Sequence, residues 1–173
     1  GITEQSLRAI SRRVYRYLYD APSEESSMQI KKSLELLSSS ETLSVKDGRL
    51  WSPQRKNPGY SELKILSRLV EPVLEKLFVI LSLASTRRFN ELDLRDKTES
   101  ILSYLGELRK TSKASNLTQG LTEESIDKAI SSSLIRVTED KRVHAGKVAK
   151  LAIALFEPLM SEDIIEILSK RET

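Results

Sequence analysis

The chain contains 173 residues, of which 39% are hydrophobic and 31% charged, as expected for one soluble globular domain or two small lobes that share a core. It has no cysteine and one histidine, which excludes disulfides, thiolate zinc sites and multi-histidine metal clusters, so we expect no metal or cofactor. The net charge of +3 permits an anionic partner without requiring one. Because the sequence begins with Gly1 and holds only two methionines, we expect a fragment of a longer protein.

Residues 1–52 predict an N-terminal lobe of two helices and a hairpin. The first helix, capped by Thr3, is predicted from apolar residues at intervals of three and four, namely Leu7, Ile10, Val14, Tyr17 and Leu18. A second helix is predicted over about residues 24–38. Its inward-facing residues are expected to be Met28, Leu34 and Leu37. The pair Asp47-Gly48 then predicts the turn of a short hairpin.

A proline-rich stretch, residues 53–60, predicts a linker to a long apolar helix over about residues 61–84. The longest run without a charge in this helix, LFVILSLA, has eight residues, whereas a bilayer core requires about 20. We therefore expect no transmembrane segment. The helix is apolar over most of its circumference, which predicts a central position covered on several sides, for Leu66, Leu69, Val70, Val73, Leu74, Leu77, Phe78, Ile80 and Leu81. Pro72 predicts a kink or a break.

Residues 61–173 are expected to form a second lobe that includes the central helix. A helix over about residues 91–110 carries an apolar stripe, Leu94, Ile101, Leu102, Leu105 and Leu108. A polar loop, a short helix starting at Thr122, a hairpin within 134–144, a helix over 147–156 and a helix capped by Ser161 follow. The expected fold is mainly α, with two short β-hairpins.

The two hairpin regions resemble each other. SSSETLSVKDGRLW (residues 38–51) and SSSLIRVTEDKRVH (residues 131–144) align with one gap, which matches Val45 with Val137, Arg49 with Arg142 and Leu50 with Val143. Helices followed by a small hairpin are typical of a winged-helix unit, so the chain could hold two such units around the central helix. Duplication and convergent amphipathic patterning both explain this likeness.

No catalytic motif is present in the sequence. The six glycines are scattered singly, so a phosphate-binding loop is missing, and no Gly-x-Ser-x-Gly elbow occurs. His144 is followed by AGKVAK, without an acid in the next turn, and we interpret it as a surface or packing residue. The acidic pairs Glu24/Glu25 and Glu123/Glu124 stand at helix starts, where the helix dipole explains them.

Basic residues suggest a contact with an anionic surface. Arg8, Arg12 and Arg16 are spaced by four and form one ridge on the first helix, with Arg13 beside it. The ridge could be extended by Lys31, Lys32, Arg55 and Lys56. A solvated helix face and contact with phosphates both explain this pattern. Aromatic residues are few and are not interleaved with these charges, so we expect no nucleic-acid partner.

Trp51, the sole tryptophan, closes the first hairpin. Two interpretations stay open for it. Its ring either packs against a neighbouring helix or forms a contact with a partner domain.

Five segments spread over residues 2–168 carry a resemblance to a known family. They are ITEQSLRAISRRVYRYLYDAP, SVKDGRLWSP, KILSRLVEPVLEKLFVILSLAS, LDLRDKTESILSYLGELR and SIDKAISSSLIRVTEDKRV. Their order resembles the C-terminal region of the membrane-associated glycerol-3-phosphate acyltransferases of the PlsB type. The resemblance implies an upstream catalytic domain with a His-x-x-x-x-Asp pair. In this chain the residue five after His144 is Ala149, so no catalytic residue is carried over.

The resemblance implies a non-catalytic C-terminal accessory domain of an acyltransferase that forms lysophosphatidic acid from glycerol 3-phosphate. Such a domain would pack on the catalytic domain of the same polypeptide and meet an anionic membrane surface through its basic ridge, in the cytoplasm and peripheral to the membrane. The alternative hypothesis is a tandem winged-helix module that binds DNA or a protein. Its recognition helices would carry few basic residues, Lys31 and Lys32 in the first and Lys128 in the second.

Overall fold

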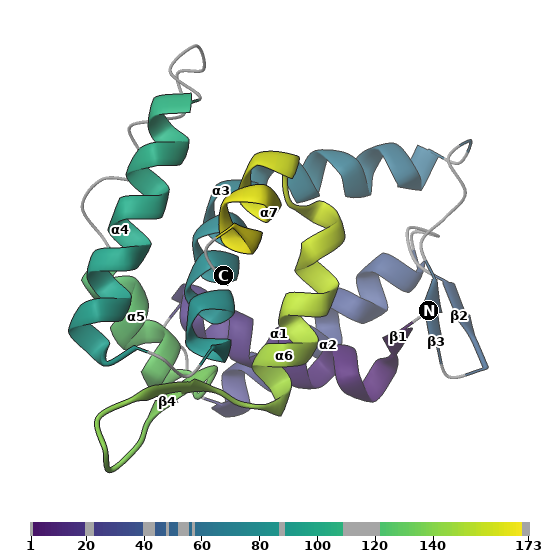
Figure 1. Ribbon diagram of the computed structural model, residues 1–173. Coiled ribbons are helices and arrows are strands. Elements are labelled where there is room, and N and C mark those ends of the chain that lie inside the picture. The colour runs from purple at the N-terminus through teal and green to yellow at the C-terminus, as the bar shows by residue number, and fades with distance from the viewer. Residues whose placement is uncertain are drawn as a thin grey trace. The chain divides into compact units, whose positions relative to one another are not determined.

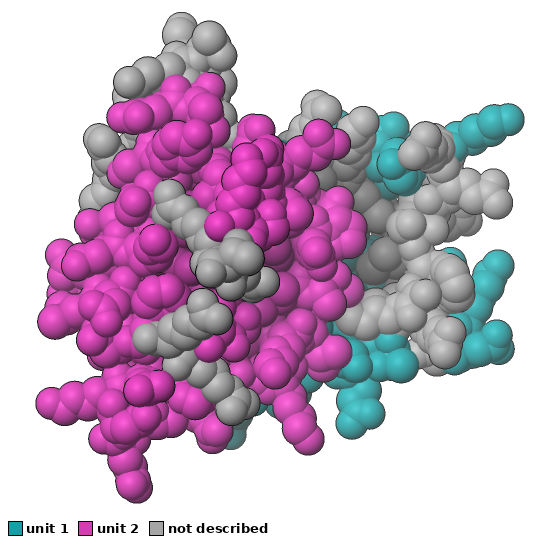
Figure 2. All heavy atoms as spheres, viewed as in Figure 1, with its two compact units in different colours: residues 1–71 teal, residues 72–173 magenta. Residues whose placement is uncertain are grey.

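The computed structural model describes residues 2–19, 23–39, 44–47, 49–51, 56, 58–86, 89–108 and 122–170, which form a mainly α-helical protein with short strands (Figure 1). The predicted fold class is thereby confirmed. The chain divides into two compact units, residues 1–71 and 72–173, here named unit 1 and unit 2 (Figure 2). The division falls at Pro72, inside a helix, and not in the linker predicted at residues 53–60. Residues 53–55 and 57 of that stretch lie outside the described residues.

Unit 1 contains two helices followed by a hairpin whose sheet includes the first strand. The elements are β1 (Ile2–Thr3), α1 (Glu4–Tyr19), α2 (Ser23–Ser39), β2 (Ser44–Lys46), β3 (Arg49–Trp51) and the first half of α3 (Pro58–Ser85). The strands are antiparallel in the order β1-β3-β2. In this sheet Thr3 lies opposite Arg49, and Val45 lies opposite Leu50. Along the chain, the hairpin of β2 and β3 follows α1 and α2 and precedes α3.

Helix α1 begins at the predicted cap, because the Ser6 backbone N–H donates a hydrogen bond to Thr3 Oγ1 at 3.2 Å. Its residues Ile10 and Tyr17 are buried, while Leu7, Val14 and Leu18 are half-buried, as shown by their exposure classes. The predicted stripe thus faces inward along its whole length, although three of its members keep partial access to solvent.

The inward face predicted for α2 needs one correction. Met28 is 50% exposed, whereas Ile30 is buried and Leu34 and Leu37 are half-buried. Ile30, Leu34 and Leu37 are spaced by four and three residues and therefore share one side of the helix. Met28 lies two residues before Ile30, which turns it about 200° away.

Helix α3 runs without interruption from Pro58 to Ser85. Of the two alternatives predicted at Pro72, a kink or a break, the break is therefore wrong and the kink stays a prediction. Proline has no N–H to donate to the carbonyl of Arg68 one turn earlier, so one intrahelical hydrogen bond is missing there. The predicted central position holds for the second half of the helix, where residues 77–81, 83 and 84 are buried. It is wrong for Val70 and Val73, which are 41% and 39% exposed on either side of the unit boundary.

Unit 2 repeats the element order of unit 1. The second half of α3 leads to residues 89–90, α4 (Glu91–Leu108), α5 (Thr122–Ser131), β4 (Ile135–Val137), β5 (Val143–Ala145), α6 (Lys147–Phe156), the 3-10 helix η2 (Glu157–Leu159) and α7 (Glu162–Ser169). Asn90 forms a bridge with Arg142, and the Val143 backbone N–H donates to the Phe89 carbonyl at 2.9 Å. Residues 89–90 therefore pair with β5, which pairs with β4, in the same order as β1-β3-β2.

The two units also agree at single positions. Asn90 occupies the place of Thr3, because each precedes the first helix of its unit and lies opposite an arginine of the hairpin. Both cap that helix in the same way, since Asn90 Oδ1 accepts a hydrogen bond from the Asp93 backbone N–H at 2.9 Å. Shared strand order and shared capping favour duplication of a unit of two helices and a hairpin over convergent patterning.

The hairpin turns account for the single gap between the repeats. In unit 1 the residue after β2, Asp47, has a φ of 52°, which suits a two-residue turn. In unit 2 the turn is one residue longer and Lys141, with a φ of 60°, supplies the left-handed residue at its end. The Lys141 backbone N–H donates to the Thr138 carbonyl at 2.9 Å, which closes this turn.

The core of unit 2 is formed by apolar residues from its helices and from β5. Helix α4 contributes a fully buried stripe, Leu94, Thr98, Ile101, Leu102 and Leu105. Leu108, predicted as part of this stripe, is 52% exposed at the end of the helix. Ile126, Val143 and Ile164 contribute to the core from α5, β5 and α7, and Ile135 contributes from β4. Helix α6 has the predicted bounds, and Ser161 occupies the predicted N-cap position of α7.

Candidate functional site

The basic ridge predicted on the first helix lies on α1 of unit 1. Arg12 is exposed, while Arg8, Arg13 and Arg16 are half-buried. The spacing of four residues places Arg8, Arg12 and Arg16 on one side of the helix, as predicted. A helix with several arginines on one side can bind an anionic group, because the guanidinium fork matches phosphate and carboxylate geometry.

The lysines predicted to extend the ridge belong to the neighbouring helix. Lys31 and Lys32 are exposed on α2, which packs directly against α1 within unit 1. Lys31 Nζ lies 3.9 Å from Glu35 Oε1, a loose pair between two exposed side chains that contributes little to stability. Lys56 is exposed, and Arg55 lies outside the described residues. The basic residues of α1 and α2 therefore belong to the same unit.

Two tyrosines accompany the arginines of α1, contrary to the expectation that aromatic residues are not interleaved with the basic ones. The rings of Tyr15 and Tyr19 lie with their centroids 4.6 Å apart and tilted by 42°. Tyr15 follows Arg12 by three residues and Tyr19 follows Arg16 by three, so these side chains share one side of α1. This spacing was available in the sequence SRRVYRYLY. Tyr19 is exposed.

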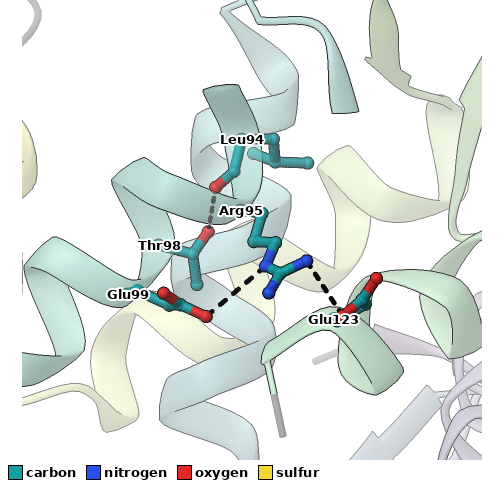
Figure 3. A network of polar contacts seen from close by, with 5 residues as sticks. All are labelled: Leu94, Arg95, Thr98, Glu99 and Glu123. Carbon is teal, nitrogen blue, oxygen red and sulfur yellow. Dashed lines mark hydrogen bonds and ion pairs between the residues drawn. The ribbon is translucent and has the colours of Figure 1, made fainter. Parts of the chain in front are cut away.

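In unit 2 the corresponding region of α4 and α5 holds a network of ion pairs (Figure 3). Arg95 Nη1 lies 2.9 Å from Glu123 Oε2, and Arg95 Nε lies 3.6 Å from Glu99 Oε1. On the buried side of α4, the Thr98 hydroxyl donates a hydrogen bond to the Leu94 carbonyl at 2.7 Å. The Arg95 guanidinium therefore joins carboxylates from both helices and links α4 to α5.

A second ion pair in unit 2, between Glu124 and Lys128, interacts electrostatically with the buried Lys76 through its glutamate. Lys76 on α3 is only 8% exposed, and burial lowers its pKa below the ordinary value, while the negative charge of Glu124 partly opposes this shift. Glu124 Oε1 also lies 2.6 Å from Lys128 Nζ. Glu123 and Glu124 thus both take part in electrostatic interactions, in addition to their predicted place in the first turn of α5.

The single histidine and the single tryptophan lie in strands. His144 is half-buried in the middle of β5, where its backbone pairs with Arg136 of β4. Trp51 ends β3, opposite Ser44, and its side chain lies outside the described part of the structure. Among the described residues, no group of three histidine, aspartate or glutamate side chains could hold a metal ion.

Within the described ranges, none of the helices combines the length and the apolar character that a membrane crossing requires. Comparisons of this chain with protein-family models, with curated proteins and with solved structures found no match.

Proposed function

We propose that this chain is a non-catalytic C-terminal accessory domain of a glycerol-3-phosphate 1-O-acyltransferase, packing on the catalytic domain of the same polypeptide. The observation that carries the proposal is the segment KILSRLVEPVLEKLFVILSLAS, residues 64–85. It carries the family resemblance, and its second half is the buried part of α3 that belongs to unit 2. Buried segments determine the architecture of a domain, so a family resemblance in this segment is informative about the fold.

The proposed role assigns acyl transfer to another part of the polypeptide. General acid–base catalysis of this reaction in the resembled family uses a histidine and an aspartate five residues later. The only histidine here, His144, has Ala149 at that position. In this proposal the domain supports the catalytic domain from the cytoplasmic side and is peripheral to the membrane. The basic ridge of α1 contacts the anionic membrane surface.

The test uses a full-length acyltransferase whose C-terminus is this chain. We expect no acyl transfer by residues 1–173 alone and a substantial loss of activity in the enzyme from which they are deleted. Adding the separate domain to the truncated enzyme should restore part of the activity, which distinguishes a supporting role from misfolding of the truncated protein. Full activity of the truncated enzyme would contradict the proposal.

A second proposal, a tandem winged-helix module that binds DNA or a protein, is supported by the repeated element order of the two units. The candidate recognition helix of unit 2 argues against DNA, because the exposed residues of α5 include Glu123, Glu124 and Asp127. These carboxylates would repel phosphates. A gel shift with duplex DNA that weakens steeply with salt would support this second proposal.

A further inference from the structure

Helix α6 is apolar on two sides, and in the described part of the structure only one of them is buried. The buried side consists of three residues spaced by three and four, Ala149, Ala152 and Phe156. The second side is formed by Leu151 and Ala154, which are exposed, and by Leu155, which is half-buried. A helix that is apolar on more than one side is typical of a position covered on several sides.

The second apolar side continues beyond the end of α6 into η2. Leu151 is 46% exposed, and Leu159 of η2 is 52% exposed. Exposed apolar residues that adjoin one another, unlike single ones, indicate a surface that contacts another molecule. We name this surface the α6 face, and it consists of Leu151, Ala154, Leu155, Pro158 and Leu159.

The charges of α6 are placed against its helix dipole. Lys147 and Lys150 are exposed near its N-terminus, and Glu157 is exposed directly after its last residue. A helix dipole favours acids at the N-terminus and bases at the C-terminus, and α4, α5 and α7 all carry acids in their first turn. The reversed order in α6 is unfavourable within the helix, but it is complementary to a neighbouring helix of the same sequence that runs in the opposite direction.

Unit 1 contains the same pattern of residues. The segments KILSRLVEPV (residues 64–73) and KLAIALFEPL (residues 150–159) each follow the hairpin of their unit and match without a gap. Ile65 and Val73, the counterparts of Leu151 and Leu159, are 62% and 39% exposed. Exposed apolar residues at these positions are therefore a shared property of the two units and not an irregularity of α6.

We infer that the α6 face binds the α6 face of a second copy of this chain, with the two helices antiparallel. A twofold axis near Ala154 makes the two helices equivalent, so that each contact occurs twice. The axis brings Lys150 of each copy close to Glu157 of the other, because these residues lie at nearly equal distances on either side of Ala154. These opposite charges set the direction of the helices, and the small side chain of Ala154 allows a close approach.

The length of α6 sets the strength of the dimer. Its ten residues span about 15 Å, whereas stable interfaces bury about 1,200–2,000 Å². We therefore expect a weak dimer whose formation depends on protein concentration, as measured by sedimentation equilibrium. A chain that stays monomeric up to about 1 mM overturns the inference. This test does not depend on the acyltransferase role proposed above.

The decisive experiment exchanges the two charges. Lys150→Glu should weaken association by about tenfold, because it brings two glutamates together at both ends of the interface, and Glu157→Lys should do the same with two lysines. Both changes in one chain should restore association, as should an equimolar mixture of the two single variants. Unaltered association of the single variants overturns the pairing, and so does failure of the double variant and the mixture to associate.

Thermal unfolding at low micromolar concentration, where the chain is monomeric, checks that each of these variants is folded. We expect the double variant to unfold at the same temperature as the unchanged chain or at a higher one, because its charges follow the helix dipole. Restored association in the double variant therefore reports the contact between copies and not a repaired fold.

A matched pair of substitutions locates the surface. Leu151→Glu should weaken association by about tenfold or more, because it introduces a charge into the apolar α6 face. Ile65→Glu makes the equivalent change in unit 1 and should leave association unchanged. Equal weakening by both variants would mean that the α6 face contacts α3 of the second copy. Weakening by Ile65→Glu alone would place the contact on α3, and either result overturns the inference.

Disulfide cross-linking locates the twofold axis. The chain has no cysteine, so a single introduced cysteine gives an unambiguous product. Ala154→Cys should yield a covalent dimer on oxidation, because a disulfide requires Cα atoms within about 7 Å. Leu92→Cys, at a residue of α4 that is 69% exposed, serves as the control and should yield far less. Equal yields at the two positions would indicate random collisions and overturn the inference.

Discussion

Unit 1 and unit 2 share an order of elements and differ in which side of their first helix is most deeply buried. The stripe of α4 is buried throughout, with Leu94 and Ile101 fully inaccessible. Counted from the caps Thr3 and Asn90, the equivalent residues of α1 are half-buried, namely Leu7, Ser11, Val14, Tyr15 and Leu18. The residues that α1 does bury, Ile10 and Tyr17, correspond to Lys97, which is half-buried, and Tyr104, which is 46% exposed. In unit 2 the buried second half of α3 stands directly before the strand at residues 89–90.

The comparison separates two determinants of the fold. Topology follows local features that both units possess: a capping residue after a short strand, two helices and a tight turn. The depth to which the first helix is buried depends on how many other helices pack around it. Unit 2 contains the second half of α3, α6 and α7 in addition to α5. The same order of two helices and a hairpin can therefore be built with different sides of the first helix buried.

The largest expected effect comes from truncating the equivalent leucines. Leu94→Ala should lower the free energy of unfolding by about 2–5 kcal/mol, because a fully buried side chain leaves a cavity. Leu7→Ala should cost less than half as much, because its site is already partly open to solvent. Urea unfolding of both variants measures the difference, and equal losses would show that the stripes are equally enclosed.

A smaller effect is expected at the buried cation of unit 2. The pKa of Lys76 is lower in the folded than in the unfolded state, so the unfolded state binds more protons between the two values and stability rises with pH there. The destabilisation is complete below the folded-state pKa and disappears toward the unfolded value of about 10.4. Lys76→Met should therefore raise the thermal unfolding midpoint at neutral pH, with a gain that shrinks in alkaline buffer.

The exposed Lys150 provides the control for this measurement. Lys150→Met should leave the unfolding midpoint and its pH profile almost unchanged, since a surface substitution alters little. A gain for Lys76→Met that persists at all pH values would mean that better packing, and not relief of a buried charge, explains it.

The smallest effect tests the feature in which the units agree. Thr3→Ala and Asn90→Ala each remove a cap, and each should cost about 1 kcal/mol, because one backbone N–H of the first turn loses its acceptor. Replacement by serine should preserve most of the stability in both units. A loss confined to Asn90→Ala would indicate that α1 does not depend on its cap.

The sequence was sufficient for elements with a clear period or a distinctive turn. The bounds of α6 and the turn at Asp47 were predicted correctly, because each depends on residues close in the chain. The pairings of Ile2–Thr3 and of Asn90 were missed, since a strand of one or two residues has no detectable alternation. Exposure of Val70 and Val73 could not be predicted either, because it depends on where the units divide.

The candidate site shows the same limit. The ridge of Arg8, Arg12 and Arg16 follows from helical spacing alone. The pairing of Arg95 with Glu123 joins residues of two different helices, α4 and α5, and the sequence spacing does not identify it. Only the strand pairings made the two units comparable.

Because α3 closes one unit and opens the other, no exposed connecting peptide of irregular backbone stands at residue 72 for a protease to cut. Cleavage there would first require local unwinding of the helix, for which the missing hydrogen bond at Pro72 gives the most favourable point. Limited digestion should therefore separate the halves slowly, and at a rate set by fraying around this proline.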